Sequence, residues 1–586
     1  MNLNNEIGLV DVLYRSVKEF GNSPFYGIKG PNGYKWITFR IFANLVDQLR
    51  AGLHSLGIKK GDTVAIISNN SVPWAVCCYA TLSSGGIFTS LYENQRPSEW
   101  QFILKDCKAR FVFVSKIEIA TKLMECKKEL PHLEHIICLD KEADQLDSYY
   151  YLLKIGQLNP VQAYFPSSKD VMGLIYTSGT TGNPKGVVLT HGNILFNLKC
   201  VPKLIELTTE DRSLSFLPWS HIFGQVVEVH LPLYIGFSVG LAVDISTLSE
   251  NLLEVKPTLF VSVPKVFNRI YDGVMAKMNA SPKVLQTLFF RGLKYAEKKK
   301  NGEPLNLVEK SILMTAEKIV FSKIKNKFGG KLRLAVSGAA ALSPKIANFI
   351  DNLGIVVLEG YGLSETSPLV SINTPDNRRL GSVGQVVPGV KVIISPEGEI
   401  IVYGPNIMQG YLNMPEETKN VMTTDSGFKT GDTGKVDSDG YLFITGRIKE
   451  QYKLENGKYV APAPLEEELK LSGAIENACL YGSNRPHNIL LITPNREFIK
   501  KWAKNNSINI EDDPNQWNDN ASIREFFNQE IKKYTSSFKS FEIPKNFCIV
   551  GDVWGIDNGL LTPTLKLKRK IVLEKYETLI ISLYKN

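Results

Sequence analysis

The stretch YTSGTTGNPKG at residues 176–186 says most about this chain, because it places hydroxyls, glycines and one cation in a single short loop. Glycines let a backbone approach phosphate oxygens without a Cβ clash, and hydroxyls can donate to those oxygens or face a metal ion. Lys185 adds a mobile positive charge. These features predict a loop that holds a polyphosphate, and they make ATP the first ligand hypothesis.

Two other interpretations of the loop are weaker. A P-loop of the kinase or GTPase kind would need Ser or Thr after its lysine, whereas Gly186 follows Lys185 here. A flexible surface loop can also be rich in Gly, Ser and Thr. The ordered string with its embedded Pro-Lys-Gly favours the phosphate loop over the surface loop.

The segments that flank the loop predict a buried framework. VMGLIY at 171–176 is an apolar run typical of a buried strand, VVL at 187–189 predicts a second strand, and Thr190 predicts the cap of a helix beginning near His191. With 586 residues and 44% hydrophobic content, the chain can form a large multi-part N-terminal core plus one smaller domain. Strand-like runs that alternate with helical intervals predict an α/β fold with mixed sheets, and they lie at 63–68, 109–115, 135–139, 259–263 and 332–336.

Four further motifs lie downstream: LEGYGLSET at 358–366, KTGDTG at 429–434, GRIKE at 446–450 and LTPTLKLKR at 561–569. Alone, each has an ordinary explanation, as a strand-to-loop transition, a hairpin turn, a charged linker and a solvated basic tail. Together with the first loop, they resemble the adenylate-forming superfamily of acyl-CoA synthetases, aryl-CoA ligases, luciferases and peptide-synthetase adenylation domains. The resemblance covers nearly the whole chain.

The resemblance implies how the nucleotide is held. In the family the aromatic ring of the second motif stacks on adenine, here Tyr361, and its acidic residue binds magnesium, here Glu365 with help from Thr177. A magnesium ion prefers oxygen ligands and commonly bridges one or two protein groups to phosphates. Asp432 would accept hydrogen bonds from the two ribose hydroxyls. Ser364 stands where the family more often has Thr.

The motif GRIKE at 446–450 precedes a C-terminal part that the resemblance implies is mobile. Arg447 would reach the nucleotide and Lys449 would be the pivot, whereas Gly446 and Glu450 stand where the family frequently has Asp. We therefore expect residues 1–446 to form the AMP-binding domain and residues 447–586 to form a small mobile α+β lid, as in acyl-CoA synthetases. After the pivot, the loop KLENGKY at 453–459 would swing in, with its glycine leaving room for a pantetheine arm.

The last motif contains the family's C-terminal lysine. The family order of Lys, an aliphatic residue, any residue and Arg selects Lys566 rather than Lys568. The resemblance implies that Lys566 reaches into the cleft toward the carboxylate and the phosphate under attack. In that reaction a carboxylate oxygen attacks the α-phosphorus of ATP, and pyrophosphate leaves. A thiol then attacks the acyl-adenylate, and AMP leaves.

These arguments assign three sets of site residues. The expected catalytic residues are Lys566, Lys185, Glu365 and His221. The expected magnesium ligands are Thr177 and Glu365. The expected cofactor-binding residues are Thr177, Ser178, Gly179, Thr180, Thr181, Gly182, Lys185, Gly338, Ala339, Glu359, Gly360, Tyr361, Gly362, Ser364, Asp432, Arg447, Lys449, Lys453 and Gly457.

Two apolar stretches bear on the acyl substrate. FLPWSHIFG at 216–224 resembles the segment that lines the family's acyl pocket, and SGAAALS at 337–343 resembles the small-residue loop between the acyl and adenine sites. Neither contains an Asp that could pair with an α-amino group, which favours an aliphatic acid. His221 is more readily a packed or capping residue than a general base, because an ionised carboxylate needs none. In the family it closes the carboxylate pocket.

An insert-like stretch at 281–331 is typical of long-chain members and tilts the substrate toward a medium- or long-chain fatty acid. Its lysines could favour an anionic lipid surface, although a solvated helical face is the commoner explanation. One departure is Gly224-Gln225, where many eukaryotic long-chain enzymes have Glu-Arg, so chain length does not transfer from that branch.

Composition is consistent with an intracellular enzyme. The net charge of +9 suits binding of ATP, CoA and fatty-acid-bearing membranes, and it does not require nucleic acid. The eight cysteines show no CxxC spacing, and the N-terminus lacks a secretory pattern. No apolar run reaches membrane-spanning length. We expect a cytoplasmic protein in which any membrane contact is peripheral.

The sequence thus predicts an AMP-forming fatty acid–CoA ligase that uses ATP, Mg²⁺ and CoA. One alternative is an acyl-AMP ligase that loads a carrier protein. Another is a catalytically silent relative that only binds acyl groups or nucleotide.

Overall fold

The structure is a computed structural model that describes residues 7–140, 147–177, 184–338, 340, 342–562 and 565–585. Within these ranges the strands form five sheets. Sheet 1 runs in the order β16 (Gln385–Val386), β15 (Leu369–Ile372), β14 (Val356–Gly362), β13 (Leu334–Ser337), β12 (Leu259–Ser262), β10 (Arg212–Ser215), β11 (Ser238–Leu241), β1 (Pro24–Gly30) and β2 (Gly33–Thr38). Sheet 2 runs in the order β19 (Gly410–Tyr411), β9 (Lys185–Thr190), β8 (Val171–Thr177), β4 (Ile87–Leu91), β3 (Thr63–Ile67), β5 (Phe111–Val114), β6 (His135–Cys138) and β7 (Asp147–Ser148).

The remaining strands form three smaller sheets. Sheet 3 is antiparallel and contains β17 (Lys391–Ile394), β18 (Glu399–Tyr403), β20 (Phe428–Val436) and β21 (Leu442–Arg447). The C-terminal part holds the hairpin of β22 (Tyr452–Lys453) and β23 (Tyr459–Val460), and a sheet of β24 (Ile475–Tyr481), β25 (Ile489–Pro494) and β26 (Asn546–Ile549).

Helices cover these sheets. Those before residue 447 are α1 (Leu9–Phe20), α2 (Phe39–Ser55), α3 (Val72–Ser83), α4 (Pro97–Asp106), α5 (Ile117–Glu125), α6 (Tyr149–Leu158), α7 (His191–Leu204), α8 (Ile222–Gln225), α9 (Leu231–Ile235), α10 (Leu248–Val255), α11 (Pro264–Asn279), α12 (Lys283–Lys300), α13 (Leu307–Ala316), α14 (Ser322–Asn326), α15 (Pro344–Asn352) and α16 (Pro415–Val421). Those after it are α17 (Pro462–Leu469), α18 (Arg496–Asn505), α19 (Ala521–Tyr534), α20 (Arg569–Lys575) and α21 (Glu577–Ser582).

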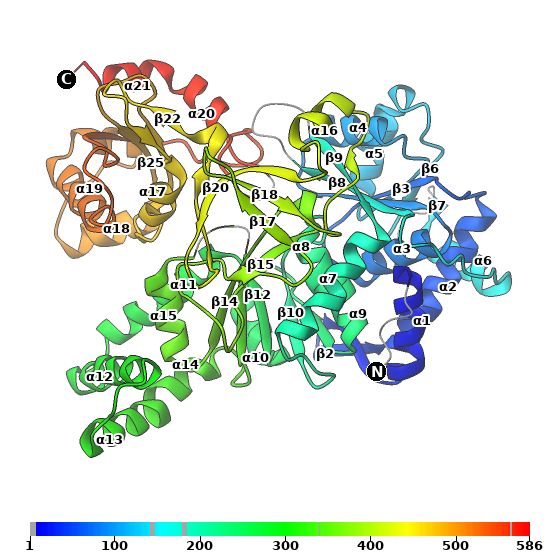
Figure 1. The fold of residues 1–586 in the computed structure, drawn as a ribbon, viewed down its shortest axis with the longest axis horizontal. Helices are drawn as coiled ribbons and strands as arrows, with labels where there is room; N and C mark the ends of the chain where they lie inside the picture. Colours follow the sequence, from blue (N-terminus) through cyan, green and yellow to red (C-terminus); the bar gives the residue numbers. More distant parts are fainter. Residues whose placement is uncertain are drawn as a thin grey trace.

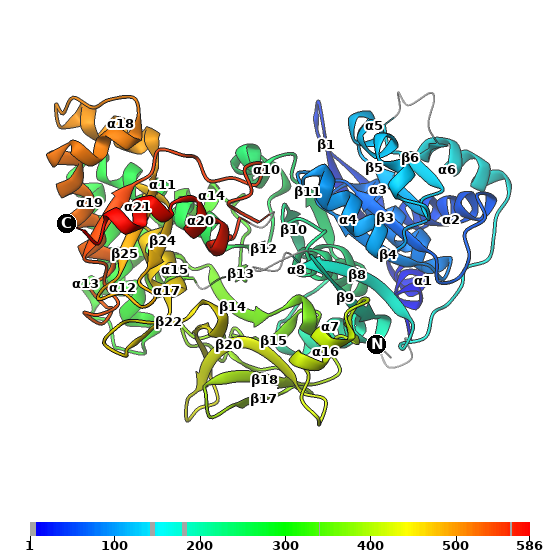
Figure 2. The ribbon, with the colours of Figure 1, turned by 90° about the horizontal axis from the view of Figure 1, so that it is seen from above.

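The burial of each sheet follows from its sequence. Every residue of β3 and β5 is buried, as expected for apolar parallel strands that are covered on both faces. Strand β18 alternates between buried and partly buried residues, as expected for an antiparallel sheet with one solvated face. Figures 1 and 2 show sheet 2 with its helices at one end of the molecule, and the C-terminal elements at the other.

The framework around residues 176–186 forms as the sequence predicts. Strand β8 ends at Thr177, and β9 begins at Lys185 directly opposite it in an antiparallel pair. The Thr190 hydroxyl then accepts the Asn193 N–H at 3.1 Å and caps α7, which begins at His191. The loop residues 178–183 lie outside the described ranges. The predicted class, α/β with mixed sheets, is confirmed.

The C-terminal elements have apolar clusters of their own. One surrounds Leu465, Leu490 and Trp517, and another surrounds Leu491 and Trp554. Contact with the rest of the chain includes Leu471, which joins an apolar cluster built mainly from α11 to α15. All eight cysteines are free thiols. Among the described residues, no helix combines the length and apolar character needed to cross a membrane.

Candidate active site

Three residues predicted to hold the nucleoside meet at one carboxylate. Strands β20 and β21 place Asp432 opposite Arg447, whose Nε donates to Asp432 Oδ1 at 2.7 Å. The Tyr361 hydroxyl, at the end of β14, donates to Asp432 Oδ2 at 2.7 Å. Asp432 is buried. Because each oxygen of an ionised carboxylate has two lone pairs, Asp432 can still accept hydrogen bonds from a pair of ribose hydroxyls.

A second cluster forms around Tyr411, which the sequence arguments missed. Pairing of β19 with β9 brings Tyr411 beside the end of the phosphate loop. Its hydroxyl donates to Glu365 Oε1 at 2.8 Å, and Lys185 Nζ lies 5.1 Å from the centre of its ring. Lys185 also forms an ion pair with Glu417 at 2.5 Å. The cluster therefore joins the predicted phosphate-binding lysine to the predicted magnesium ligand.

Glu417 was also missed, and no motif marks it. The hydrogen bond and charge of Lys185, together with the charge of Lys449, lower the pKa of the Glu417 carboxyl. In the sequence, Glu416 and Glu417 after Pro415 indicate only the start of a helix. Their approach to the phosphate loop comes from the tertiary fold.

Thr177 and Glu365 fit a magnesium ion by their chemistry. One supplies a hydroxyl and the other a carboxylate, the oxygen ligands that Mg²⁺ prefers. In the described part of the chain, no three His, Cys, Asp or Glu side chains come together as a preformed metal site. A magnesium ion here would therefore need the oxygens of a bound phosphate.

The two stretches predicted to border the acyl and adenine sites pack against each other. A Cβ at Gly338 would lie 3.0 Å from the Phe223 ring, so the close approach favours glycine. Glu359 accepts the N–H groups of Leu342 at 3.3 Å and Gly381 at 3.4 Å, and burial raises its pKa to about 7. Glu359 thus anchors the small-residue loop. Ala339 lies outside the described residues.

Three other cofactor-binding candidates lie beside these groups. Gly360 pairs with Ile372 across sheet 1. A Cβ at Gly362 would lie only 1.7 Å from the carbonyl oxygen of Pro368, which requires glycine there. Ser364 is buried at the start of the short turn that carries Glu365.

The His221 side chain caps the N-terminus of α8 and is not arranged as a general base. Its Nδ1 accepts the Phe223 N–H at 3.2 Å, so a neutral ring carries its proton on Nε2. Burial, helped by the nearby charge of Lys566, lowers the pKa of His221 to about 4. The imidazole is therefore neutral at pH 7, with an N–H available as a hydrogen-bond donor.

Lys566, in the C-terminal part, lies close enough to His221, Arg447 and Asp432 for their charges to interact. The Thr562 N–H donates to the Lys566 carbonyl at 2.8 Å, and the Lys566 N–H donates to the Thr562 hydroxyl at 3.0 Å. The surrounding protein and the charge of Arg447 lower the pKa of Lys566, while Asp432 raises it. Among the described residues no carboxylate lies within ion-pair distance of Lys566, so its charge can meet that of a ligand.

Lys568 and Arg569, two and three residues after Lys566, bind this segment to different parts of the molecule. Arg569 donates to both carboxylate oxygens of Glu466 in α17, at 2.8 and 2.6 Å. Lys568 Nζ lies 3.5 Å from Glu99 Oε1 in α4, and their side chains are only 13% and 16% exposed. Glu99 is also held by Arg96 at 3.2 Å. The ion pair between Lys568 and Glu99 was not foreseen, and no motif marks Glu99.

Three predicted residues lie on the surface in this arrangement. Lys453 and Gly457 lie in the exposed turn between β22 and β23, where Gly457 has φ +84°. Lys449 is exposed on the short turn between β21 and β22. The contacts of this turn, such as the hydrogen bond from the Asn484 N–H to the Lys453 carbonyl at 2.8 Å, lie within the C-terminal part.

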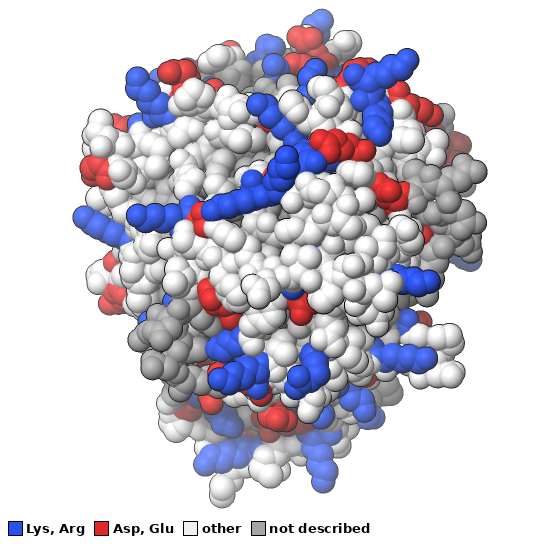
Figure 3. All heavy atoms as spheres, turned by 90° about the vertical axis from the view of Figure 1, so that its right-hand side faces the viewer, with Lys and Arg blue, Asp and Glu red and all other residues white. Residues whose placement is uncertain are grey.

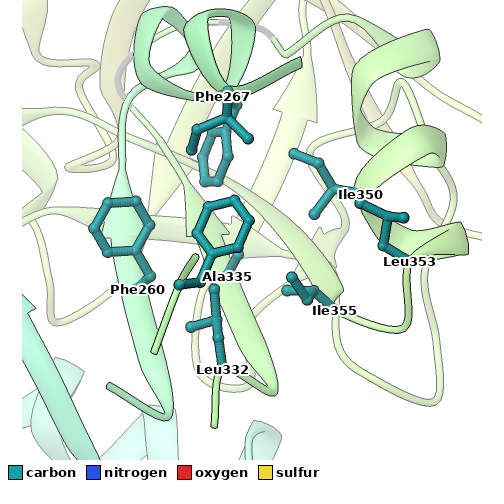
Figure 4. Close-up of a pocket in the computed structure, with 9 residues that line it drawn as sticks. Phe260, Phe267, Leu332, Ala335, Ile350, Leu353 and Ile355 are labelled. Carbon is teal, nitrogen blue, oxygen red and sulfur yellow. The ribbon is translucent and has the colours of Figure 1, made fainter. Parts of the chain in front are cut away.

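A small apolar cavity lies behind sheet 1. It has a volume of about 10 Å³ and is lined by residues that include Phe260, Phe267, Ile350 and Leu353 (Figure 4). This volume holds no more than a water-sized group, so the cavity is too small for an acyl chain.

Comparison with known proteins identifies the family. A model described as AMP-binding enzyme matches residues 13–412, and one described as AMP-binding enzyme C-terminal domain matches residues 449–586. A long-chain-fatty-acid–CoA ligase of Mycobacterium bovis is 32% identical over 557 residues, covering 92% of each chain. Long chain acyl-CoA synthetase 3 of Arabidopsis thaliana is 31% identical over 616 residues, covering 98% of this chain and 91% of the relative.

Solved structures share the fold at lower identity. The adenylation domain of a Mycobacterium chelonae carboxylate reductase has a TM-score of 0.81 at 22% identity, covering 100% of this chain and 92% of that one. An anthranilate CoA ligase in complex with anthranoyl-AMP has a TM-score of 0.74 at 20% identity, covering 97% of each chain.

Proposed function

The chain belongs to the AMP-binding enzyme family, and on that premise we propose that it is an AMP-forming fatty acid–CoA ligase. It would join a medium- or long-chain fatty acid to AMP, with release of pyrophosphate, and then transfer the acyl group to CoA. The relatives named as long-chain acyl-CoA synthetases support the acyl substrate and the final thioester. The observation that carries the proposal is the convergence of Tyr361, Asp432 and Arg447 near Lys566, which has no ion-pair partner among the described residues.

In the first half-reaction, the body would hold ATP while Lys566 approaches the reacting groups. Tyr361 would contact adenine, Asp432 would accept from the ribose hydroxyls, and Lys185 would face the phosphates. Lys566 would stabilise negative charge on the α-phosphate and align the fatty acid carboxylate. Phosphoryl chemistry depends mostly on such positioning and charge neutralisation. Thr177 and Glu365 would hold magnesium, which supplies further positive charge to the phosphates when bound.

Two protein features would order the carboxylate. His221 is neutral, and its Nε2–H can donate to a carboxylate oxygen or to the charge that develops beside it. Gly338 lets the Phe223 ring approach the backbone closely, where the acyl and adenine segments meet. The apolar residues of the 216–224 segment suit an aliphatic chain better than a charged one.

In the second half-reaction, the C-terminal domain would turn away and admit CoA. We take residues 447–586 as this domain, residues 1–446 as the body and Lys449 as the pivot. In this arrangement the turn that carries Lys453 and Gly457 is exposed and contacts the C-terminal part, as expected of a CoA-side loop before the domain turns. In the turned position this loop would meet the pantetheine arm.

Two other functions remain to be separated by experiment. An acyl-AMP ligase that loads a carrier protein shares the first half-reaction, and a silent relative shares only the binding. The joint presence of Lys566, Glu365 and Asp432 argues against silence.

The test measures pyrophosphate release and thioester formation over a panel of carboxylates, with and without CoA. The proposal expects pyrophosphate with long aliphatic acids and thioester only when CoA is added. Pyrophosphate release without thioester would favour the carrier-protein ligase. Absence of both with every acid would favour the silent relative and overturn the proposal.

A further inference from the structure

Nearly all the net charge of the chain lies in one projecting segment. Residues 281–331 contain twelve Lys or Arg residues and four Glu, a net charge of +8, whereas the whole chain has +9. Figure 1 shows that α12 and α13, in this segment, form a helical hairpin that projects from the lower left of the molecule. On the end of the molecule drawn in Figure 3, basic and acidic side chains are interspersed. The charge of this segment is therefore a local feature, and +4 of it lies in the hairpin itself, residues 283–316, which contain seven Lys or Arg and three Glu.

The hairpin is firmly packed on its inner side. A Cβ at Gly292 in α12 would lie 2.5 Å from the Cβ of Ala316 in α13, so the two helices approach closely. Phe289 and Phe321 are buried in the apolar cluster that also contains Phe349 of α15. The exposed side chains of the hairpin therefore extend from helices that are packed against the rest of the protein.

The outward face of α13 combines apolar side chains with lysines. Leu307 is 84% exposed, Val308 and Met314 are each 67% exposed, and Ile319 is 42% exposed. At α-helical spacing Leu307 and Met314 lie on one line of α13, opposite the buried Leu313 and Ala316, with Val308 beside them. Ile319 lies in the π-helical turn Glu317–Phe321 that continues α13. Lys310 lies beside Met314 on α13, and the exposed Lys318 lies in the π-helical turn between the exposed Glu317 and Ile319. We call these six residues, Leu307, Val308, Lys310, Met314, Lys318 and Ile319, the α13 patch.

The charge of the patch is not neutralised by the protein. Lys298 pairs with Glu309 at 3.0 Å, and Lys300 pairs with Asp351. Lys310 and Lys318 have no carboxylate partner within ion-pair distance in the described part of the chain. A partner for the patch must therefore be anionic and must also cover apolar side chains.

We propose that the α13 patch binds an anionic membrane surface. Leu307, Val308 and Met314 would enter the boundary between headgroups and acyl chains, while Lys310 and Lys318 would reach lipid phosphates. A nucleic acid would satisfy the lysines but leave the apolar side chains in water. The membrane satisfies both groups. The proposal concerns where the protein docks, and it adds a surface to the ligase function without depending on it.

The test measures flotation of the full chain with vesicles of phosphatidylcholine plus phosphatidylglycerol, and with vesicles of phosphatidylcholine alone. Binding should occur only to the anionic vesicles and weaken as salt increases. Two double variants probe the patch: Leu307→Ser with Met314→Ser, and Lys310→Gln with Lys318→Gln. Each should weaken vesicle binding by roughly tenfold or more, because each removes one of the two contributions.

Matched controls use exposed residues of the same types elsewhere. Leu158→Ser changes an apolar side chain of α6 that is 74% exposed, and Lys501→Gln with Lys504→Gln changes exposed lysines of α18. Both controls should bind like the unmodified chain. Equal binding by patch and control variants, or no binding by the unmodified chain, would overturn the proposal. Binding to duplex DNA that needs the lysines but ignores Leu307 and Met314 would also overturn it.

An activity assay separates this proposal from the ligase function. With fatty acid dispersed in detergent, the patch variants should form acyl-CoA at the rate of the unmodified chain, since the patch lies outside the nucleotide site. If neither the unmodified chain nor any variant activates a carboxylate, the ligase proposal fails while the vesicle result still stands. If the patch variants lose activity in detergent yet bind vesicles normally, the docking proposal fails.

Discussion

The two sides of the nucleotide site are built in different ways. On one side, Tyr361 and Asp432 of the body form one hydrogen-bonded group with Arg447, which lies at the domain boundary, around a buried carboxylate. On the C-terminal side, Lys566 has no ion-pair partner among the described residues, and its segment touches the body through the pair between Lys568 and Glu99. The difference indicates that the residues that bind the nucleoside are preorganised. Lys566, in contrast, can move into the nucleotide site and out of it with the C-terminal domain. Variants on the two sides should therefore separate the two half-reactions.

Removal of Lys566 should have the largest effect. Lys566→Ala should reduce pyrophosphate release by about a hundred- to a thousandfold, because a preorganised positive charge is lost at the phosphate. Thioester formation from supplied acyl-adenylate should be largely retained. The two steps are measured separately, with Lys570→Ala as the control at an exposed lysine of α20. Equal loss in both steps would contradict the assigned role.

A change on the body side should affect both steps. Asp432→Asn removes the charge that holds Arg447 and accepts from the ribose, so nucleotide binding should weaken by about ten- to a hundredfold. Titration with ATP and with AMP measures the binding, and both half-reactions should slow. Selective loss of adenylation alone would remove the distinction between the two sides.

A restriction at the pivot should affect the second step. Lys449→Pro restricts the backbone between β21 and β22. Thioester formation should fall by roughly tenfold or more, while pyrophosphate release in single turnover stays near normal, because the restriction opposes the domain motion. Thioester synthesis at the original rate would count against Lys449 as the hinge.

The contact between the two sides should have the smallest effect. Glu99→Gln removes a partly buried ion pair, which is worth about 1 kcal/mol, so adenylation should slow by roughly two- to tenfold. Thioester formation from supplied acyl-adenylate should not slow. Lys568→Gln, which removes the same ion pair from the other side, should slow adenylation to a similar extent. Adenylation at the original rate in both single variants would show that the pair does not position Lys566.

The sequence predicts local structure and the motif residues better than it predicts their neighbours. Strands β8 and β9 and the Thr190 cap follow from patterns that span only a few residues. Tyr361, Asp432 and Arg447 were assigned because each lies in a motif of the family. Lys185 and Glu417 are 232 residues apart, and nothing local joins them. Tyr411 and Glu99 similarly acquire their contacts only from tertiary packing.

The central claim is that Lys566 occupies the nucleotide site for adenylation and must leave it for thioester formation. A short bismaleimide cross-link between Glu99→Cys and Lys568→Cys would hold the arrangement in this structure, in a Cys126→Ser background that removes the one partly exposed native thiol. Single-turnover assays before and after cross-linking measure both steps. The account predicts that the cross-linked protein still forms acyl-adenylate but makes almost no thioester. Thioester formation at an undiminished rate would contradict it.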